Sequence, residues 1–152
     1  FVSMRSDILN ENSSYSKTLR KIKHVTEAVT LTPEDSGTLF LIDQSSGAYA
    51  ITLPECLTKD NEMLGWNAEF ILHTVASNAV TIVVTDDDGN NIHGHGIDGE
   101  DGAAQTVTEG TGVDVITIIS GATKGDRVSL VSDGDSFYVF SLAADKAHIT
   151  FS

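Results

Sequence analysis

One stretch of this chain, residues 124–139, constrains the fold more than any other. It contains two runs in which apolar and polar residues alternate, with the pair Asp133-Gly134 between them. Such a pair between alternating runs is a strong signal for a β-hairpin, because glycine adopts the positive φ that a tight turn requires. We therefore predict two antiparallel strands, over residues 126–132 and 136–142.

Short apolar runs recur along most of the chain, separated by turns rich in glycine, aspartate, asparagine and serine. There are 13 glycines and 2 prolines, and no segment keeps a helical apolar period over three turns. This pattern predicts an all-β fold, an antiparallel β-sandwich or barrel-like domain of about nine short strands. Besides the hairpin, we expect strands near residues 25–31, 38–43, 48–53, 66–74, 79–85, 113–119 and 146–151.

The chain has the size of one domain, to which we add an N-terminal arm. Its 152 residues are 40% hydrophobic, and a domain of this size buries roughly 70% of the surface that the unfolded chain exposes. Residues 1–24 hold five basic and two acidic side chains, a net charge of +3, whereas the whole chain carries −13. We therefore divide the chain into a basic arm, residues 1–24, and an acidic β-domain, residues 25–152.

The acidic charge of the β-domain argues against two classes of partner. Its long-range field repels nucleic acid and anionic membrane surfaces, so we expect neither as a partner. No apolar stretch approaches the roughly 20 residues that a membrane-spanning helix requires. The first residues also lack the basic and apolar regions of a secretory signal. We expect a soluble protein.

Several classes of enzyme lack their usual sequence signatures here. Cys56 is the single cysteine, so neither an intramolecular disulfide nor a cysteine-based metal cluster can form. Its partly apolar neighbourhood and the adjacent Glu55 disfavour the thiolate, so we interpret Cys56 as a small buried residue. No Gly-x-Ser-x-Gly elbow and no phosphate-binding glycine loop is present. We predict a protein without catalytic residues and without a cofactor.

The segment 86–102 is rich in aspartate, glycine and histidine, and we interpret it as a long exposed loop. Asp86 and Asp88 alternate like the start of an EF-hand loop, but the glycine and glutamate that such a loop needs further on are missing. His93 and His95 would point to the same side of a strand and could hold a transition metal, yet the sequence assigns them no third ligand. We predict no metal site, and these four residues are the weak candidates.

The remaining histidines and the large aromatic residues have a structural interpretation. His24, His73 and His148 lie in or beside predicted strands, so we interpret them as structural. Trp66 and the pair Phe137-Tyr138 lie in strand-like contexts, and we predict that they pack in the core. The alternative for these aromatic residues is an exposed platform that binds sugars.

Six sequence elements follow one another in an order that resembles a β-domain of tailed-bacteriophage virion proteins. The resemblance covers residues 29–140. The elements are VTLTPEDSG at 29–37, FLI at 40–42, ITLP at 51–54, GWNAEFIL at 65–72, NIHG at 91–94 and the segment from KGDRV to SDG at 124–134.

This resemblance implies a capsid decoration (cement) protein. Such a protein is a homotrimer on the outer surface of the virion, where it binds the major capsid protein and stabilises the junctions between capsomers. The first alternative is a module of a tail fibre, spike or adaptor involved in host attachment, and the second is a carbohydrate- or calcium-binding module. For the decoration protein, charge asymmetry favours contacts to the capsid from the arm residues Leu19, Arg20, Lys21, Ile22 and Lys23.

Overall fold

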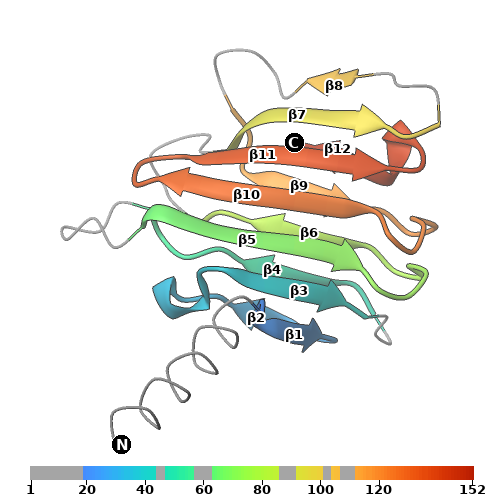
Figure 1. Ribbon diagram of the computed structural model, residues 1–152. Coiled ribbons are helices and arrows are strands. Elements are labelled where there is room, and N and C mark those ends of the chain that lie inside the picture. The colour runs from blue at the N-terminus through green and yellow to red at the C-terminus, as the bar shows by residue number, and fades with distance from the viewer. Residues whose placement is uncertain (1–18, 44–46, 57–62, 86–91, 101–103, 107–111) are drawn as a thin grey trace, which may run out of the picture.

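The computed structural model describes residues 19–43, 47–56, 63–85, 92–100, 104–106 and 112–152, of which 104–106 only as backbone. It confirms an all-β fold, in which two sheets pack face to face as a sandwich (Figure 1). The strands alternate between buried and exposed residues. This alternation is the period of two that the sequence shows, because successive side chains of a strand point to opposite faces of the sheet.

The larger sheet, called sheet A here, has seven strands, and the smaller, sheet B, has five. The spatial order in sheet A is β1 (Ile22–Val25), β3 (Thr38–Ile42), β5 (Leu64–Leu72), β10 (Arg127–Asp133), β11 (Phe137–Ala143), β7 (Ile92–Asp98) and β8 (Ala104–Thr106). In sheet B it is β12 (Ile149–Phe151), β9 (Val115–Ile118), β6 (Val80–Val83), β4 (Tyr49–Thr52) and β2 (Val29–Thr30). Two short 3₁₀ turns, η1 (Pro33–Asp35) and η2 (Lys146–His148), complete the described elements.

The sheets are mixed, whereas the sequence analysis expected antiparallel pairing. The first six strands alternate between the sheets, so that β1, β3 and β5 run parallel in sheet A while β2, β4 and β6 run parallel in sheet B. Among the residues that the structure describes, five of the ten pairs of neighbouring strands are parallel. After each of these strands the chain passes to the opposite sheet. Each strand therefore pairs with the next strand but one in sequence, and not with the next. Turn residues mark where strands end, but not which strands become partners.

The predicted hairpin is present as β10 and β11, which pair antiparallel. The carboxylate of Asp133 accepts hydrogen bonds from the backbone N–H groups of Asp135 and Ser136, at 2.9 and 2.8 Å. Gly134 adopts φ of +97° in the turn. The side chain of Asp133 and the positive φ of Gly134 therefore stabilise the turn, as the Asp-Gly pair predicts.

The expectation of a loop over residues 86–102 is wrong for part of this segment, because β7 is a paired strand of sheet A. Two glycines of β7, Gly94 and Gly96, allow this strand to pack closely against β11. A Cβ on Gly94 would lie 2.0 Å from the carbonyl oxygen of Val139, and one on Gly96 would lie 2.4 Å from Oγ of Ser141. The glycine content that indicated a loop therefore reflects the close approach of β7 to β11.

The core lies between the two sheets and confirms most of the aromatic predictions. Trp66 and Phe137 are buried and meet edge to face, with ring centroids 5.8 Å apart. Cys56 is also buried. Tyr138 is exposed, so its predicted core position is wrong. It follows Phe137 directly on a strand, and consecutive residues of a strand face opposite sides of the sheet.

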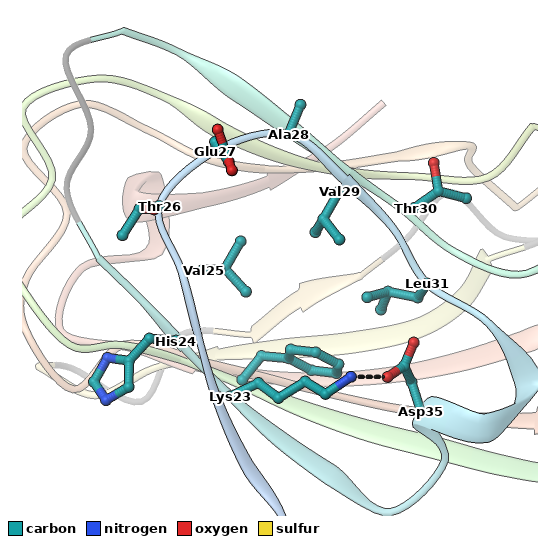
Figure 2. A pocket seen from close by; sticks show the side chains of 11 residues that line it. Lys23, His24, Val25, Thr26, Glu27, Ala28, Val29, Thr30, Leu31 and Asp35 are labelled. Atoms are coloured by element: carbon teal, nitrogen blue, oxygen red, sulfur yellow. Dashed lines mark hydrogen bonds and ion pairs between the residues drawn. The ribbon is translucent and has the colours of Figure 1, made fainter.

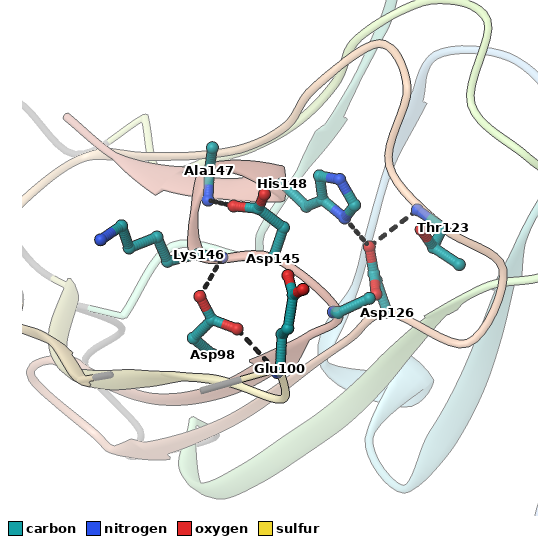
Figure 3. Close-up of polar contacts among 9 residues, drawn as sticks. Asp98, Glu100, Thr123, Asp126, Asp145, Lys146, Ala147 and His148 are labelled. Carbon is teal, nitrogen blue, oxygen red and sulfur yellow. Dashed lines mark hydrogen bonds and ion pairs between the residues drawn. The ribbon is translucent and has the colours of Figure 1, made fainter. Parts of the chain in front are cut away.

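Two buried carboxylates tie the loops together at one end of the sandwich (Figure 3). Asp126 accepts hydrogen bonds from the backbone N–H groups of Ala144 and Thr123 and from Nδ1 of His148. Asp98 accepts from the backbone N–H groups of Glu100 and Lys146. A buried carboxylate with several donors is a structural brace, and His148 takes part in it.

Candidate functional site

The outer face of β7, β10 and β11 carries a contiguous group of exposed apolar side chains. These strands lie side by side in sheet A, with β11 between the other two (Figure 1). The group, called the apolar face here, consists of Ile97, Val131, Tyr138, Phe140 and Leu142, whose exposed fractions range from 39% to 49%.

The strand register arranges the outward residues in three rows. The rows are Val131–Tyr138–His93, Ser129–Phe140–His95 and Arg127–Leu142–Ile97. Arg127 is the one charged residue among these nine, taking the histidines as neutral, and its guanidinium contacts Glu69 at 3.3 Å. The whole chain has 31 Asp, Glu, Lys and Arg residues among 152. The apolar face is therefore poor in charge on a strongly charged protein.

The strand β11 explains why the face is apolar. Its inward residues include Phe137 and Val139, and its outward residues include Phe140 and Leu142. Scattered exposed apolar residues are ordinary, but a contiguous group on one face is what an interaction surface requires. No residue that the structure describes covers this face.

One side chain of the apolar face is held in place before any partner binds. The hydroxyl of Tyr138 donates a hydrogen bond to the carboxylate of Asp133, with 3.0 Å between the oxygens. This hydrogen bond and the negative charge of Asp133 raise the pKa of Tyr138. The ring of His93 lies beside the Tyr138 ring, with centroids 6.1 Å apart. A side chain already fixed loses less conformational entropy on binding.

The arm residues named by the sequence analysis largely belong to the β-domain. Ile22 and Lys23 lie in β1, the first strand among the described residues. Leu19 is exposed. Arg20 forms an ion pair with Glu69, and Lys23 forms one with Asp35. Nζ of Lys21 lies 3.5 Å from the carbonyl oxygen of Glu34.

These contacts tie the basic residues of the arm hypothesis to the domain. The three cations that give residues 1–24 their net charge all have acceptors within the domain, where they hold β1 at the edge of sheet A. Residues 1–18, outside the described residues, hold two basic and two acidic side chains and are neutral overall. Capsid contacts by Leu19, Arg20, Lys21, Ile22 and Lys23 stay a prediction.

The structure describes two of the four metal-ligand candidates of the sequence analysis. Asp86 and Asp88 lie outside the described residues, and His93 and His95 lie on the outer face of β7. The one group of three close potential ligands in the described parts of the chain is His24, Asp43 and His73. The sequence analysis missed it because His24 lies in β1, Asp43 directly follows β3 and His73 directly follows β5, and these strands become neighbours only through parallel pairing.

A hollow of about 290 Å³ lies beneath the connection between β1 and β2 (Figure 2). Its lining includes the apolar side chains of Val25 and Leu31 and the ion pair of Lys23 with Asp35. Burial raises the pKa of Asp35, but hydrogen bonds from Lys23 and Thr32 outweigh this effect, and the pKa lies below its ordinary value. The residues described here form a brace for β1 rather than a nucleophile with a base.

A scan against protein-family models finds no match to the chain, and a search of curated proteins finds no significantly similar one. Among the described residues there is also no helix with the length and apolar character to cross a bilayer.

Proposed function

We propose that this protein is a structural component of a tailed-phage virion and that it self-associates through the apolar face. In this account it decorates the outside of the capsid as a homotrimer. The observation that carries the proposal is the contiguous apolar face on an otherwise acidic body. The order of sequence elements over residues 29–140 supports the assignment to a virion.

Charge favours a second copy of the chain as the molecule that covers this face. Residues 25–152 hold four basic and 20 acidic side chains, so two copies repel one another over most of their surfaces. The outward residues of β7, β10 and β11 carry two formal charges of opposite sign, those of Arg127 and Asp133, so copies can approach one another through this face at low electrostatic cost. Apolar area removed from water there contributes about 25 cal/mol per Å².

A trimer on a capsid needs no catalytic chemistry to stabilise it. A protein that binds only the assembled shell shifts the equilibrium toward that shell by mass action. Three linked copies bind with higher apparent affinity than one, because the second and third contacts are intramolecular. The acidic surface left outside would keep particles apart in solution.

The alternatives differ in location or in ligand. A module of a tail fibre or spike would use the same sandwich at another place on the virion. A sugar-binding platform is less well supported, because Trp66 and Phe137 are buried and only Tyr138 of the three named aromatic residues is exposed. The calcium alternative rests on Asp86 and Asp88, which lie outside the described residues.

Electron microscopy with a gold-labelled antibody tests the proposal. The antibody is raised against the purified protein and applied to tailed-phage particles induced from the organism that carries the sequence. We expect gold over the heads, and pre-absorption with the protein should remove it. Gold confined to the tails would favour the fibre or spike alternative over capsid decoration. Particles without gold, from a culture that produces the protein, would contradict the virion assignment.

A further inference from the structure

Three side chains at the other side of sheet A converge on one point. Nδ1 of His24 lies 2.5 Å from one carboxylate oxygen of Asp43, and Nδ1 of His73 lies 2.5 Å from the other. The three potential ligand atoms all lie within 4.8 Å of one another. The two imidazole rings meet edge to face, with centroids 5.2 Å apart.

Parallel pairing brings these residues together. His24 lies opposite Leu41 in β3, and Leu41 lies opposite Ile71 in β5. Asp43 and His73 follow two residues later on their strands, so all three side chains lie on the outer face, away from the core. The backbone N–H of Asp43 bonds to Val25, and that of His73 bonds to Ile42, at 2.9 and 2.8 Å.

The backbone beneath the cluster is fixed by a buried side chain. The hydroxyl of Tyr49 lies 3.0 Å from each of two carbonyl oxygens, those of Val25 and Asp43. Both neighbouring atoms are carbonyl oxygens, which only accept, so the Tyr49 hydroxyl is the donor. The cluster is therefore attached to paired strands and to backbone that Tyr49 holds, which is the support that a precise binding site requires.

We propose that His24, Asp43 and His73 bind a divalent first-row transition-metal ion, with Zn²⁺ as the ion that the side chains suit best. Two imidazole nitrogens and a carboxylate are ligands that Zn²⁺ accepts, at about 2.0–2.2 Å. Ca²⁺ is excluded as the preferred ion, because it takes six to eight oxygen ligands and this cluster offers one carboxylate. Two of the side chains are partly exposed to solvent, which leaves room for a water molecule as a fourth ligand.

A metal at this position would join three neighbouring parallel strands of sheet A, β1, β3 and β5. His24 belongs to β1, Asp43 follows β3 and His73 follows β5. A ligand that binds only the folded chain stabilises it by mass action, so Zn²⁺ would hold β1 at the edge of sheet A. The cluster lies on strands other than those of the apolar face, so the inference is independent of the proposed function.

Zinc titration of untagged protein, stripped of metal with a chelator, tests the proposal. We expect one Zn²⁺ per chain by calorimetry and by metal analysis after dialysis. We also expect the thermal midpoint to rise by roughly 5–10 °C at a free Zn²⁺ concentration about 100 times Kd. The variants His24→Gln and His73→Gln should each lose affinity by about tenfold or more.

A matched control is His95→Gln, which removes an exposed histidine of the same sheet outside the cluster. It should bind Zn²⁺ as the wild type does. Circular dichroism of each variant shows whether it is folded, and Co²⁺ in place of Zn²⁺ reports histidine ligation through its visible absorption. The proposal is overturned if the wild type binds no Zn²⁺, or if folded His24→Gln and His73→Gln variants keep the wild-type affinity. Loss of binding in His95→Gln alone would also overturn it.

Discussion

The side chain of Thr38 places a hydroxyl group in the core, where it makes no hydrogen bond with the described residues. Its side chain is fully buried, and its Oγ1 has no hydrogen-bond partner among the described residues. A buried hydroxyl without a partner retains the cost of its desolvation. The position therefore offers a direct test of how the core is packed.

We expect Thr38→Val to raise the free energy of unfolding by about 1 kcal/mol, because valine has nearly the same shape and no hydroxyl. Urea denaturation measures this change. The control is Thr150→Val in β12, where the side chain is exposed, and its effect should stay within about 0.5 kcal/mol. A Thr38→Val variant less stable than the wild type would show that the hydroxyl has a partner.

Gly94 is required by its surroundings. It adopts φ of +140°, and a Cβ would lie 2.0 Å from the carbonyl oxygen of Val139. We expect Gly94→Ala to lower the free energy of unfolding by about 2–4 kcal/mol, since both the backbone and β11 must shift. Gly47→Ala is the control, because nothing lies within 4 Å of its Cβ position. Equal stability of the two variants in urea would contradict the close contact of β7 with β11.

At the scale of elements, β1 is an edge strand that ion pairs hold in place. Asp35 accepts hydrogen bonds from Lys23 and from the backbone N–H of Thr32. Its pKa in the folded protein lies below the ordinary value of 3.8. The ionised carboxylate therefore stabilises the fold above that ordinary pKa, and this contribution is lost as the pH falls through the folded-state pKa.

We expect Asp35→Asn to cost about 1–2 kcal/mol of unfolding free energy at pH 7. The difference between wild type and variant should shrink below pH 4 and vanish once Asp35 is protonated in the folded protein. Urea denaturation at a series of pH values measures it, and comparison with the variant cancels the titration of other carboxylates. A difference that is constant from pH 7 to pH 2 would contradict the role of the charge.

The local sequence predicted the positions of the strands better than it predicted which strands pair. The pair Asp133-Gly134 specifies a turn through groups within four residues, so the hairpin could be predicted. Gly94 was misread, because the reason for this glycine is the backbone of Val139, which is distant in sequence. Tyr138 was placed in the core together with Phe137, although only one of two consecutive strand residues can face inward.

The candidate sites were harder to predict for the same reason. The apolar face is formed by β7 and by the hairpin of β10 and β11, which is distant from β7 in sequence. Strand β11 pairs with β7 in parallel, and no turn residue predicts that pairing. The cluster of His24, Asp43 and His73 depends on two further parallel pairings. Individual residues of both sites could be noticed in the sequence, but their proximity is a property of the topology.

For the molecule as a whole, the two halves of sheet A have different roles in this account. The parallel strands β1, β3 and β5 carry the proposed metal site, while β10, β11 and β7 carry the apolar face. The central claim is that copies of the chain associate through this face. An acidic protein gains little from contact elsewhere, because like charges oppose it.

Light scattering on a sizing column measures the native mass and tests this claim most directly. We expect the wild type at three times the chain mass of 16.2 kDa, and Phe140→Glu at 16.2 kDa, because the new carboxylates repel one another in the interface. Val75→Glu alters an exposed apolar residue off the face and should keep the wild-type mass. A wild type at twice the chain mass would retain self-association but exclude the trimer. A wild type at 16.2 kDa, or a Phe140→Glu variant with the wild-type mass, would contradict the account.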